Sequence, residues 1–310
     1  MVLIGASQLY TGYSAPLAWQ DYGFTSYPLT VSNIPARLYG SLLTEAVNRQ
    51  HPKLIVVDID GFINDEDTEK LEANLRKWLD NMPWSHNKIE TIRTCVPAEL
   101  QTSFYFNIAK YHANWYQIDS WLPVQRRLRA MDKTGYSLSK GVETVCKSLP
   151  ADFTPDVRPL TLSDANAQYL RDFCAQAQSI GADVLFLRTP HRTQTTDPNV
   201  FNDVAAVVGE YGYELLDLHD AFDTIGLDRC ADFIDSDHLN TIGMEKFTVW
   251  FGRYLTGRYD LTGTHSETVT AEWERCADFT TQTLPLSKKL AAENTNQNLN
   301  EFSAVFDAYR

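Results

Sequence analysis

The chain has 310 residues, of which 44% are hydrophobic, so it is long and apolar enough to bury a large core. Its formal net charge is −13 and its isoelectric point is about 4.9. We expect no nucleic-acid partner, because binding of phosphate groups requires clustered Lys and Arg. The composition favours one large α/β domain, with or without an insertion, and argues against general disorder.

Five scattered cysteines predict neither a disulfide framework nor a zinc site, because they are odd in number and lack metal-binding spacing. We expect no metal and no cofactor. No stretch of about eighteen apolar residues is present, so the sequence predicts no membrane span and, as written, a soluble chain. Its abrupt start, with a core strand at the second residue, leaves open the loss of an upstream anchor or signal. That loss would place the protein outside the cytoplasm.

The first ten residues contain a buried strand that ends just before Ser7. Residues 2–4 form a continuous apolar run, which is typical of a strand covered on both faces, and Gly5 permits a sharp exit from it. In open α/β sheets the ligand crevice lies beyond the carboxyl ends of the strands, so a serine here would face substrate. The alternative is an ordinary turn serine. A loop is expected after Ser7, followed by a helical turn at 17–22.

Four further strands alternate with helices along the chain. Strands are predicted at about 26–29, 54–59, 183–187 and 214–218, and helices at about 35–49, 162–180, 199–211 and 241–255. Strand, helix and strand at this spacing indicate parallel βαβ units. Five such strands predict a doubly wound, three-layer α/β/α sandwich.

This alternation stops between about residues 64 and 160, where a helical insertion rich in aromatic residues is expected. At helical spacing, aromatic side chains favour a packed core over a surface that stacks on sugar rings. The arginine-rich stretch 126–131 is interpreted as a solvated helix face. We assign residues 1–256 to one domain and 257–310 to a helical tail, with helices around Trp273 and from about Leu286.

A second informative stretch, residues 231–243, carries three carboxylates and His238 ahead of an amphipathic helix. A serine nucleophile needs a base to take its proton, and a histidine base needs a carboxylate that fixes its tautomer. Asp235, three residues before His238, meets that need, and Asp237 competes with it. The alternative is that one of these carboxylates only caps the following helix. Together with Ser7, the stretch favours a Ser/His/Asp triad.

Polar residues that follow other strands are candidates for binding substrate or a developing oxyanion. Asn33 follows the second predicted strand and Asn64 the third, and polar loops of this kind supply oxyanion donors. The backbone N–H of Ser7 is a further candidate donor. Arg188 and His191 follow the fourth strand at the same edge of the sheet and are candidates for binding substrate.

At these motifs the chain resembles the SGNH/GDSL hydrolase superfamily. The tripeptide at 5–7, Gly-Ala-Ser, is similar to the first block of that family. The run at 235–240, Asp-Ser-Asp-His-Leu-Asn, together with Gly243, is similar to its last block. The resemblance spans about residues 2–255 and is strongest to bacterial SGNH-like proteins with a long helical insertion. It implies a flavodoxin-like sheet that carries the triad in this chain order.

The resemblance implies Ser7 as nucleophile, His238 as base and Asp235 as the acid that orients it. Ala6 and Gln8 stand where the name motif has Asp and Leu, and neither position carries out the chemistry.

Two blocks of the family are harder to place. No residue in 30–35 clearly matches the second-block glycine, and the run 61–65 has one residue too many for the third-block Gly-x-Asn-Asp. The sequence therefore leaves the oxyanion hole unassigned. Loss of one such donor typically lowers the rate by roughly 10²- to 10³-fold, which allows a weak esterase.

The sequence thus predicts a metal-independent serine acyl-ester hydrolase or O-acyltransferase with an acyl-Ser7 intermediate. Water as acceptor gives an esterase and a sugar hydroxyl gives a transferase; the resemblance favours acylated carbohydrate as substrate. The alternative is a catalytically degenerate carbohydrate-binding or scaffold protein of the same fold. A mononucleotide-binding flavodoxin-like protein is disfavoured, because residues 5–14 offer too few clustered backbone donors for a phosphate.

Overall fold

The computed structural model describes residues 1–64, 66–107, 110, 138–294, 302, 305, 308 and 309. A five-stranded parallel sheet with the strand order β2-β1-β3-β5-β7 forms its centre. The strands are β1 (Val2–Gly5), β2 (Tyr27–Thr30), β3 (Ile55–Asp58), β5 (Val184–Arg188) and β7 (Glu214–Asp217). This confirms the predicted α/β class and the parallel sheet.

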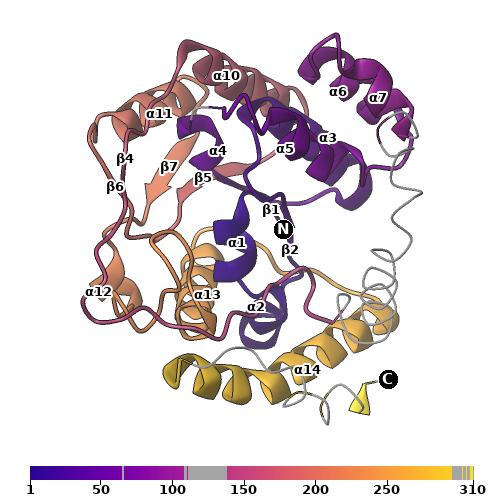
Figure 1. Ribbon diagram of the computed structural model, residues 1–310. Coiled ribbons are helices and arrows are strands. Elements are labelled where there is room, and N and C mark those ends of the chain that lie inside the picture. The colour runs from indigo at the N-terminus through magenta and orange to yellow at the C-terminus, as the bar shows by residue number, and fades with distance from the viewer. Residues whose placement is uncertain are drawn as a thin grey trace, which may run out of the picture.

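Helices cover both faces of this sheet, which gives the three layers seen in Figure 1. One face is covered by α3 (Tyr39–Gln50), α10 (Asp164–Ser179) and α11 (Val200–Gly209). The opposite face is covered by α1 (Ser7–Gly12), α2 (Ala15–Tyr22), α12 (Phe222–Ile225) and α13 (Thr241–Thr256). The long helix α14 (Glu267–Ala292) packs over α2 and α13 on that second face.

The strands are apolar on both faces because each face has its own hydrophobic core. Val2 and Ile4 point into the core beneath α3 and α10, whereas Leu3 points into the core beneath α2 and α13. All three side chains are fully buried. Complete burial of such a side chain contributes roughly 1.5–3 kcal/mol. The continuous apolar run at the start of the chain therefore reflects a central strand.

The structure corrects three local expectations. Ser7 begins helix α1, where a loop was expected. The short strands β4 (Val157–Arg158) and β6 (Gln194–Thr195), which were not predicted, form a separate parallel pair. Within the described part of the tail, α14 continues through Pro285 as a single helix over 267–292, where separate helices around Trp273 and from about Leu286 were expected. Buried side chains on both sides of Pro285 hold α14 in place, and their packing outweighs the roughly 3 kcal/mol that an interior proline costs.

The predicted insertion is helical over much of 66–107, whereas its described residues 138–160 form turns, loop and the short strand β4 in place of the expected helix. It contains α5 (Leu71–Leu79), α6 (His86–Cys95) and α7 (Gln101–Tyr105), and η1 (Ala36–Leu38) and α4 (Asp60–Ile63) lie nearby. Phe104 is buried in the core beneath α3, and Trp78 packs against it. Trp84 and Phe106 are 62% and 64% exposed, so core packing was the wrong expectation for these two. The arginine-rich stretch lies outside the described residues.

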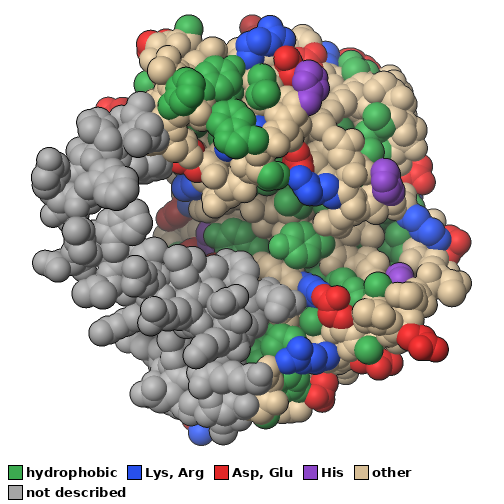
Figure 2. Space-filling model, turned by 90° about the vertical axis from the view of Figure 1, so that its right-hand side faces the viewer, with side chains coloured by type: hydrophobic (Ala, Val, Ile, Leu, Met, Phe, Trp, Pro, Cys, Tyr) green, Lys and Arg blue, Asp and Glu red, His purple; other side chains and the backbone are tan. Residues whose placement is uncertain are grey.

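The described helices and surface bear on membrane insertion and on binding of polyanions. None of the helices in the described ranges is long and apolar enough to cross a membrane. On the described part of the face in Figure 2, acidic and basic side chains are interspersed, and no broad basic patch is visible there.

Gly5 ends β1 at the point where β3 comes closest to it. A Cβ atom on Gly5 would lie 2.4 Å from the Cβ of Asp58 and 3.0 Å from a methyl carbon of Leu9. The next residue, Ala6, donates its backbone N–H to Oδ2 of Asp58 at 3.3 Å. Gly5 is therefore required by this close approach, and the turn that follows is tied directly to the neighbouring strand.

We expect Gly5→Ala to lower the free energy of unfolding by about 1–3 kcal/mol, because two central strands must separate to admit the methyl group. Urea denaturation followed by circular dichroism measures the change. Gly209→Ala is the matched control: a Cβ there meets no atom within 4 Å, and the variant should be unchanged or slightly more stable. Equal stability of Gly5→Ala and the wild type would contradict the close approach.

Candidate functional site

Ser7 lies at the carboxyl edge of the sheet because β1 ends two residues earlier and α1 begins at this residue. Its carbonyl oxygen accepts a hydrogen bond from Oγ1 of Thr11 at 3.1 Å, which ties the first turn of α1 together. The residue is only 9% exposed. Its hydroxyl is thus held in a defined position at the edge where α/β proteins bind ligands.

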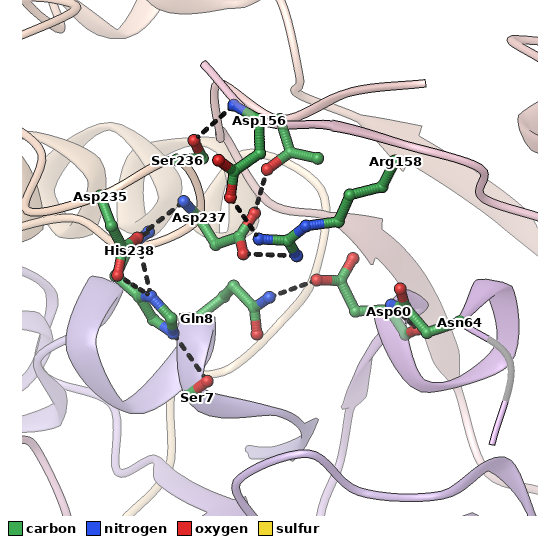
Figure 3. Close-up of polar contacts among 11 residues, drawn as sticks. Ser7, Gln8, Asp60, Asn64, Asp156, Arg158, Asp235, Ser236, Asp237 and His238 are labelled. Carbon is green, nitrogen blue, oxygen red and sulfur yellow. Dashed lines mark hydrogen bonds and ion pairs between the residues drawn. The ribbon is translucent and has the colours of Figure 1, made fainter. Parts of the chain in front are cut away.

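His238 joins Ser7 to Asp235 in a continuous line of hydrogen bonds (Figure 3). Its Nε2 lies 2.7 Å from Oγ of Ser7. Its Nδ1 lies 2.9 Å from each carboxylate oxygen of Asp235. With Nδ1–H donating to the carboxylate, Nε2 is left as the acceptor for the serine proton. The three residues that the sequence singled out are therefore brought together.

The loop that carries His238 is fixed by its own backbone. Oδ1 of Asp235 accepts the backbone N–H groups of Asp237 and His238, each at 2.8 Å. The side chain of Asn240 caps α13 by accepting the N–H groups of residues 242 and 243. The alternative in which Asp235 or Asp237 caps this helix is therefore wrong. Asp235 holds the backbone and the imidazole at the same time.

The charges around His238 favour its protonated form. Burial of the imidazole opposes protonation, but the hydrogen bond and negative charge of Asp235, with help from Asp237 and Asp60, raise the pKa of His238. Burial similarly works to raise the pKa of Asp235, yet the hydrogen bonds from His238 outweigh it and lower that pKa. A carboxylate that stays ionised beside an imidazole is the arrangement that stabilises an imidazolium.

Asp237, the competing acid, does not contact the imidazole in this way. Its Oδ2 forms an ion pair with Nη1 of Arg158 at 2.7 Å, and its Oδ1 accepts a hydrogen bond from Oγ1 of Thr193. The second guanidinium nitrogen of Arg158 pairs with Asp156 at 2.8 Å. The geometry therefore gives Asp235 the contacts of an orienting acid and gives Asp237 a place in the wall of the cleft.

Ser7 and His238 open into a cleft of about 300 Å³. Its lining is mostly polar, with carboxylates, amides and two cations. The amides and charged side chains in the lining are Gln8, Asn33, Asp60, Asn64, Glu66, Asp67, Lys70, Asn74, Arg158 and Asp237. Such a surface offers many hydrogen-bonding partners to a ligand rich in hydroxyl groups.

The other sequence candidates divide into two groups. Asn33 and Asn64 line the cleft, and the amide nitrogen of Asn64 already donates to the carbonyl oxygen of Asp60 at 2.7 Å. Arg188 and His191 are buried and are not part of the cleft lining.

Arg188 and His191 contact each other in the interior of the protein. Nε of Arg188 lies 3.3 Å from Nε2 of His191, and its Nη1 forms an ion pair with Asp217 at 3.1 Å. Burial and the nearby positive charges of His219 and Arg188 lower the pKa of His191 well below its ordinary value. Direct binding of substrate by these two residues is thus not supported by their placement.

Sequence reasoning missed Gln8, Asp60 and Arg158 as parts of the site. Gln8 donates a side-chain hydrogen bond to the carboxylate of Asp60, which begins α4 two residues after the end of β3 and directly follows the strand predicted at 54–59. A carboxylate immediately after a buried strand is a signal that the sequence contained. Arg158 lies in a strand of only two residues, which is too short to leave a pattern.

Comparisons with known proteins add no assignment: no protein-family model matches the chain, and no curated protein matches it. Within the described ranges, no cluster of three or more His, Cys, Asp or Glu side chains is arranged to hold a metal ion. The arrangement of Ser7, His238 and Asp235 is suited to activating a hydroxyl nucleophile by removal of its proton.

We expect His238 to titrate above its ordinary pKa of 6.5 and Asp235→Asn to lower this pKa markedly, because burial then opposes protonation without the compensating carboxylate. A pH titration of the imidazole nitrogens by NMR measures both values. Asp237→Asn should lower the pKa by less, since its charge acts without a hydrogen bond to the ring. A larger shift in Asp237→Asn than in Asp235→Asn would assign the orienting role to Asp237.

Proposed function

We propose that this protein is a serine-dependent acyl-ester hydrolase or O-acyltransferase that acts through an acyl-Ser7 intermediate. The observation that supports the proposal most strongly is the separation of 2.7 Å between Oγ of Ser7 and Nε2 of His238, with Asp235 on the opposite nitrogen. The resemblance of these motifs to the SGNH/GDSL hydrolases is consistent with this class of reaction.

In the proposed reaction, Oγ of Ser7 attacks the ester carbonyl while Nε2 of His238 takes the serine proton. The tetrahedral intermediate collapses, and His238 returns the proton to the departing alcohol. Water, or the hydroxyl of a second alcohol, then gives its proton to His238 and attacks the acyl-enzyme. Ser7 is regenerated when it takes that proton back. Asp235 stabilises the imidazolium in both half-reactions.

The developing oxyanion needs donors within the cleft. The backbone N–H of Ser7 lies in the first turn of α1, where N–H groups have no acceptor within the helix. Of the two asparagines predicted from the sequence, Asn33 is the preferred candidate, because one of the two N–H groups of the Asn64 amide already donates to a backbone carbonyl. We therefore propose the Ser7 N–H as one donor and Asn33 as a candidate for the second.

Acylated carbohydrate is the substrate class that we propose. Its support is the polar lining of the cleft, where amides and carboxylates could bind sugar hydroxyls. Whether the acceptor is water or a second hydroxyl depends on which of the two occupies the cleft once the acyl-enzyme has formed.

We expect Ser7→Ala to lower turnover of p-nitrophenyl acetate by about 10⁴-fold or more, because the nucleophile is removed. A small fluorophosphonate should add once to the wild type and not to Ser7→Ala, as read by intact mass. Ser179→Ala, which removes an exposed hydroxyl in α10, is the control and should react normally.

The pH dependence tests the role of His238. Only neutral His238 can accept the serine proton, so modification and turnover should fall as the pH is lowered through a value above 6.5. Folded protein that forms no adduct and shows no turnover would overturn the catalytic proposal and favour a carbohydrate-binding or scaffold protein.

A further inference from the structure

Within the described lining of the cleft, three of the four carboxylates form an ion pair with a Lys or Arg side chain and the fourth, Asp60, does not. The three pairs are Glu66 with Arg37 at 2.5 Å, Asp67 with Lys70 at 2.9 Å, and Asp237 with Arg158 at 2.7 Å. Asp60 is 8% exposed and its carboxylate accepts a hydrogen bond from the neutral amide of Gln8. A ligand in this cleft therefore meets a carboxylate whose hydrogen-bonding partner carries no charge.

The two guanidinium groups whose fields reach Asp60 are already engaged by other carboxylates. Arg158 pairs with Asp156 as well as with Asp237. Arg188 lies behind the cleft lining and pairs with Asp217 at 3.1 Å. These two cations face three other carboxylates, so adding Asp60 leaves the group negative.

Gln8 holds the carboxylate of Asp60 in place without neutralising it. Its amide nitrogen is used by the carboxylate, and its buried carbonyl oxygen Oε1 has no hydrogen-bond partner among the described residues. Gln8 lines the same cleft and directly follows Ser7 (Figure 3). Oε1 of Gln8 is enclosed by protein, so the contribution of Gln8 to the cleft is the hydrogen bond that it gives to Asp60. The pair thus presents to the cleft a carboxylate that is held in place by a neutral amide, and this negative charge suits a cationic nitrogen.

We propose that Asp60, with Gln8, makes the cleft selective for esters that carry a cationic nitrogen in the part bound beside Ser7. An amino-sugar ester and a choline-like ester both belong to this class. The inference rests on the proposed acyl-transfer function. It adds a preference for cationic esters, which acyl transfer alone does not require.

The charge of Asp60 should depend on pH in an accessible range. Burial and the negative charge of Asp237 raise the pKa of Asp60 to about 6, while Arg188, His238 and Arg158 oppose the increase. The neighbouring Asp58 is fully buried, and burial followed by the charge of Asp60 raises its pKa well above the ordinary range. The preference for a cationic substrate should therefore be present above pH 6 and weaken below it.

The test compares acetylcholine with 3,3-dimethylbutyl acetate, an uncharged ester of the same shape. The measured quantity is kcat/KM for acetylcholine divided by kcat/KM for 3,3-dimethylbutyl acetate. We expect this ratio to be about 10 for the wild type at pH 8, equivalent to ~1.4 kcal/mol. Asp60→Asn keeps the shape of the side chain and an oxygen that accepts from Gln8, and it should lower that ratio to about 1. Asp203→Asn, an exposed residue in α11 outside the cleft lining, removes one charge elsewhere and should leave the ratio unchanged.

The same ratio measured from pH 8 to pH 5 separates Asp60 from His238. Protonation of His238 slows both esters equally and cancels in the ratio, whereas protonation of Asp60 affects only the cationic ester. The ratio should therefore decrease as the pH falls through about 6.

The outcomes also separate this inference from the proposed function. If both esters are hydrolysed and the ratio is the same in the wild type and in Asp60→Asn, the specificity proposal is wrong and the proposed function stands. If neither ester is hydrolysed and Ser7 forms no fluorophosphonate adduct, the proposed function is wrong, and the specificity proposal that rests on it is overturned as well. A ratio that stays constant with pH would also overturn the role of Asp60.

Discussion

The position of β1 inside the sheet is the constraint on which the site depends. All four residues of β1 pair with β2, and the first three also pair with β3, which approaches Gly5 without a side chain between them. The residue after Gly5 is then tied to Asp58 of β3 through its backbone N–H. Ser7 therefore starts α1 from a rigid base, so its hydroxyl needs no ordering when a ligand arrives.

The second half of the site is built with a different kind of rigidity. His238 lies in an irregular loop, yet Asp235 binds two backbone N–H groups of that loop and the imidazole together. One carboxylate thus determines both where the ring is placed and which nitrogen carries the proton. Asn240 completes the loop by capping α13, so the chain passes from the loop into a packed helix within two residues.

Much of the fold could be predicted from the sequence, because parallel strands buried on both faces leave continuous apolar runs. The runs at 2–4 and 54–59 correspond to β1 and β3 within one or two residues. Ser7, Asp235 and His238 could be singled out because they lie next to clear elements. The contacts of Gln8, Asp60 and Arg158 could not be predicted, because they join segments that are far apart in the chain. The break predicted between two tail helices was wrong because the tertiary packing of α14 outweighs the local preference of Pro285.

The separation of Ser7 and His238 along the chain has a consequence for biosynthesis. Ser7 and His238 are 231 residues apart, with one near the start of the chain and the other beyond the last strand of the central sheet. Translation proceeds at about 5–20 residues per second, so many seconds separate the emergence of the two groups from the ribosome. During that time the incomplete chain carries Ser7 without His238, so the contact between Oγ of Ser7 and Nε2 of His238 has not yet formed. Under the proposed function, a nascent chain would therefore stay unreactive toward esters until the segment that carries His238 has been made.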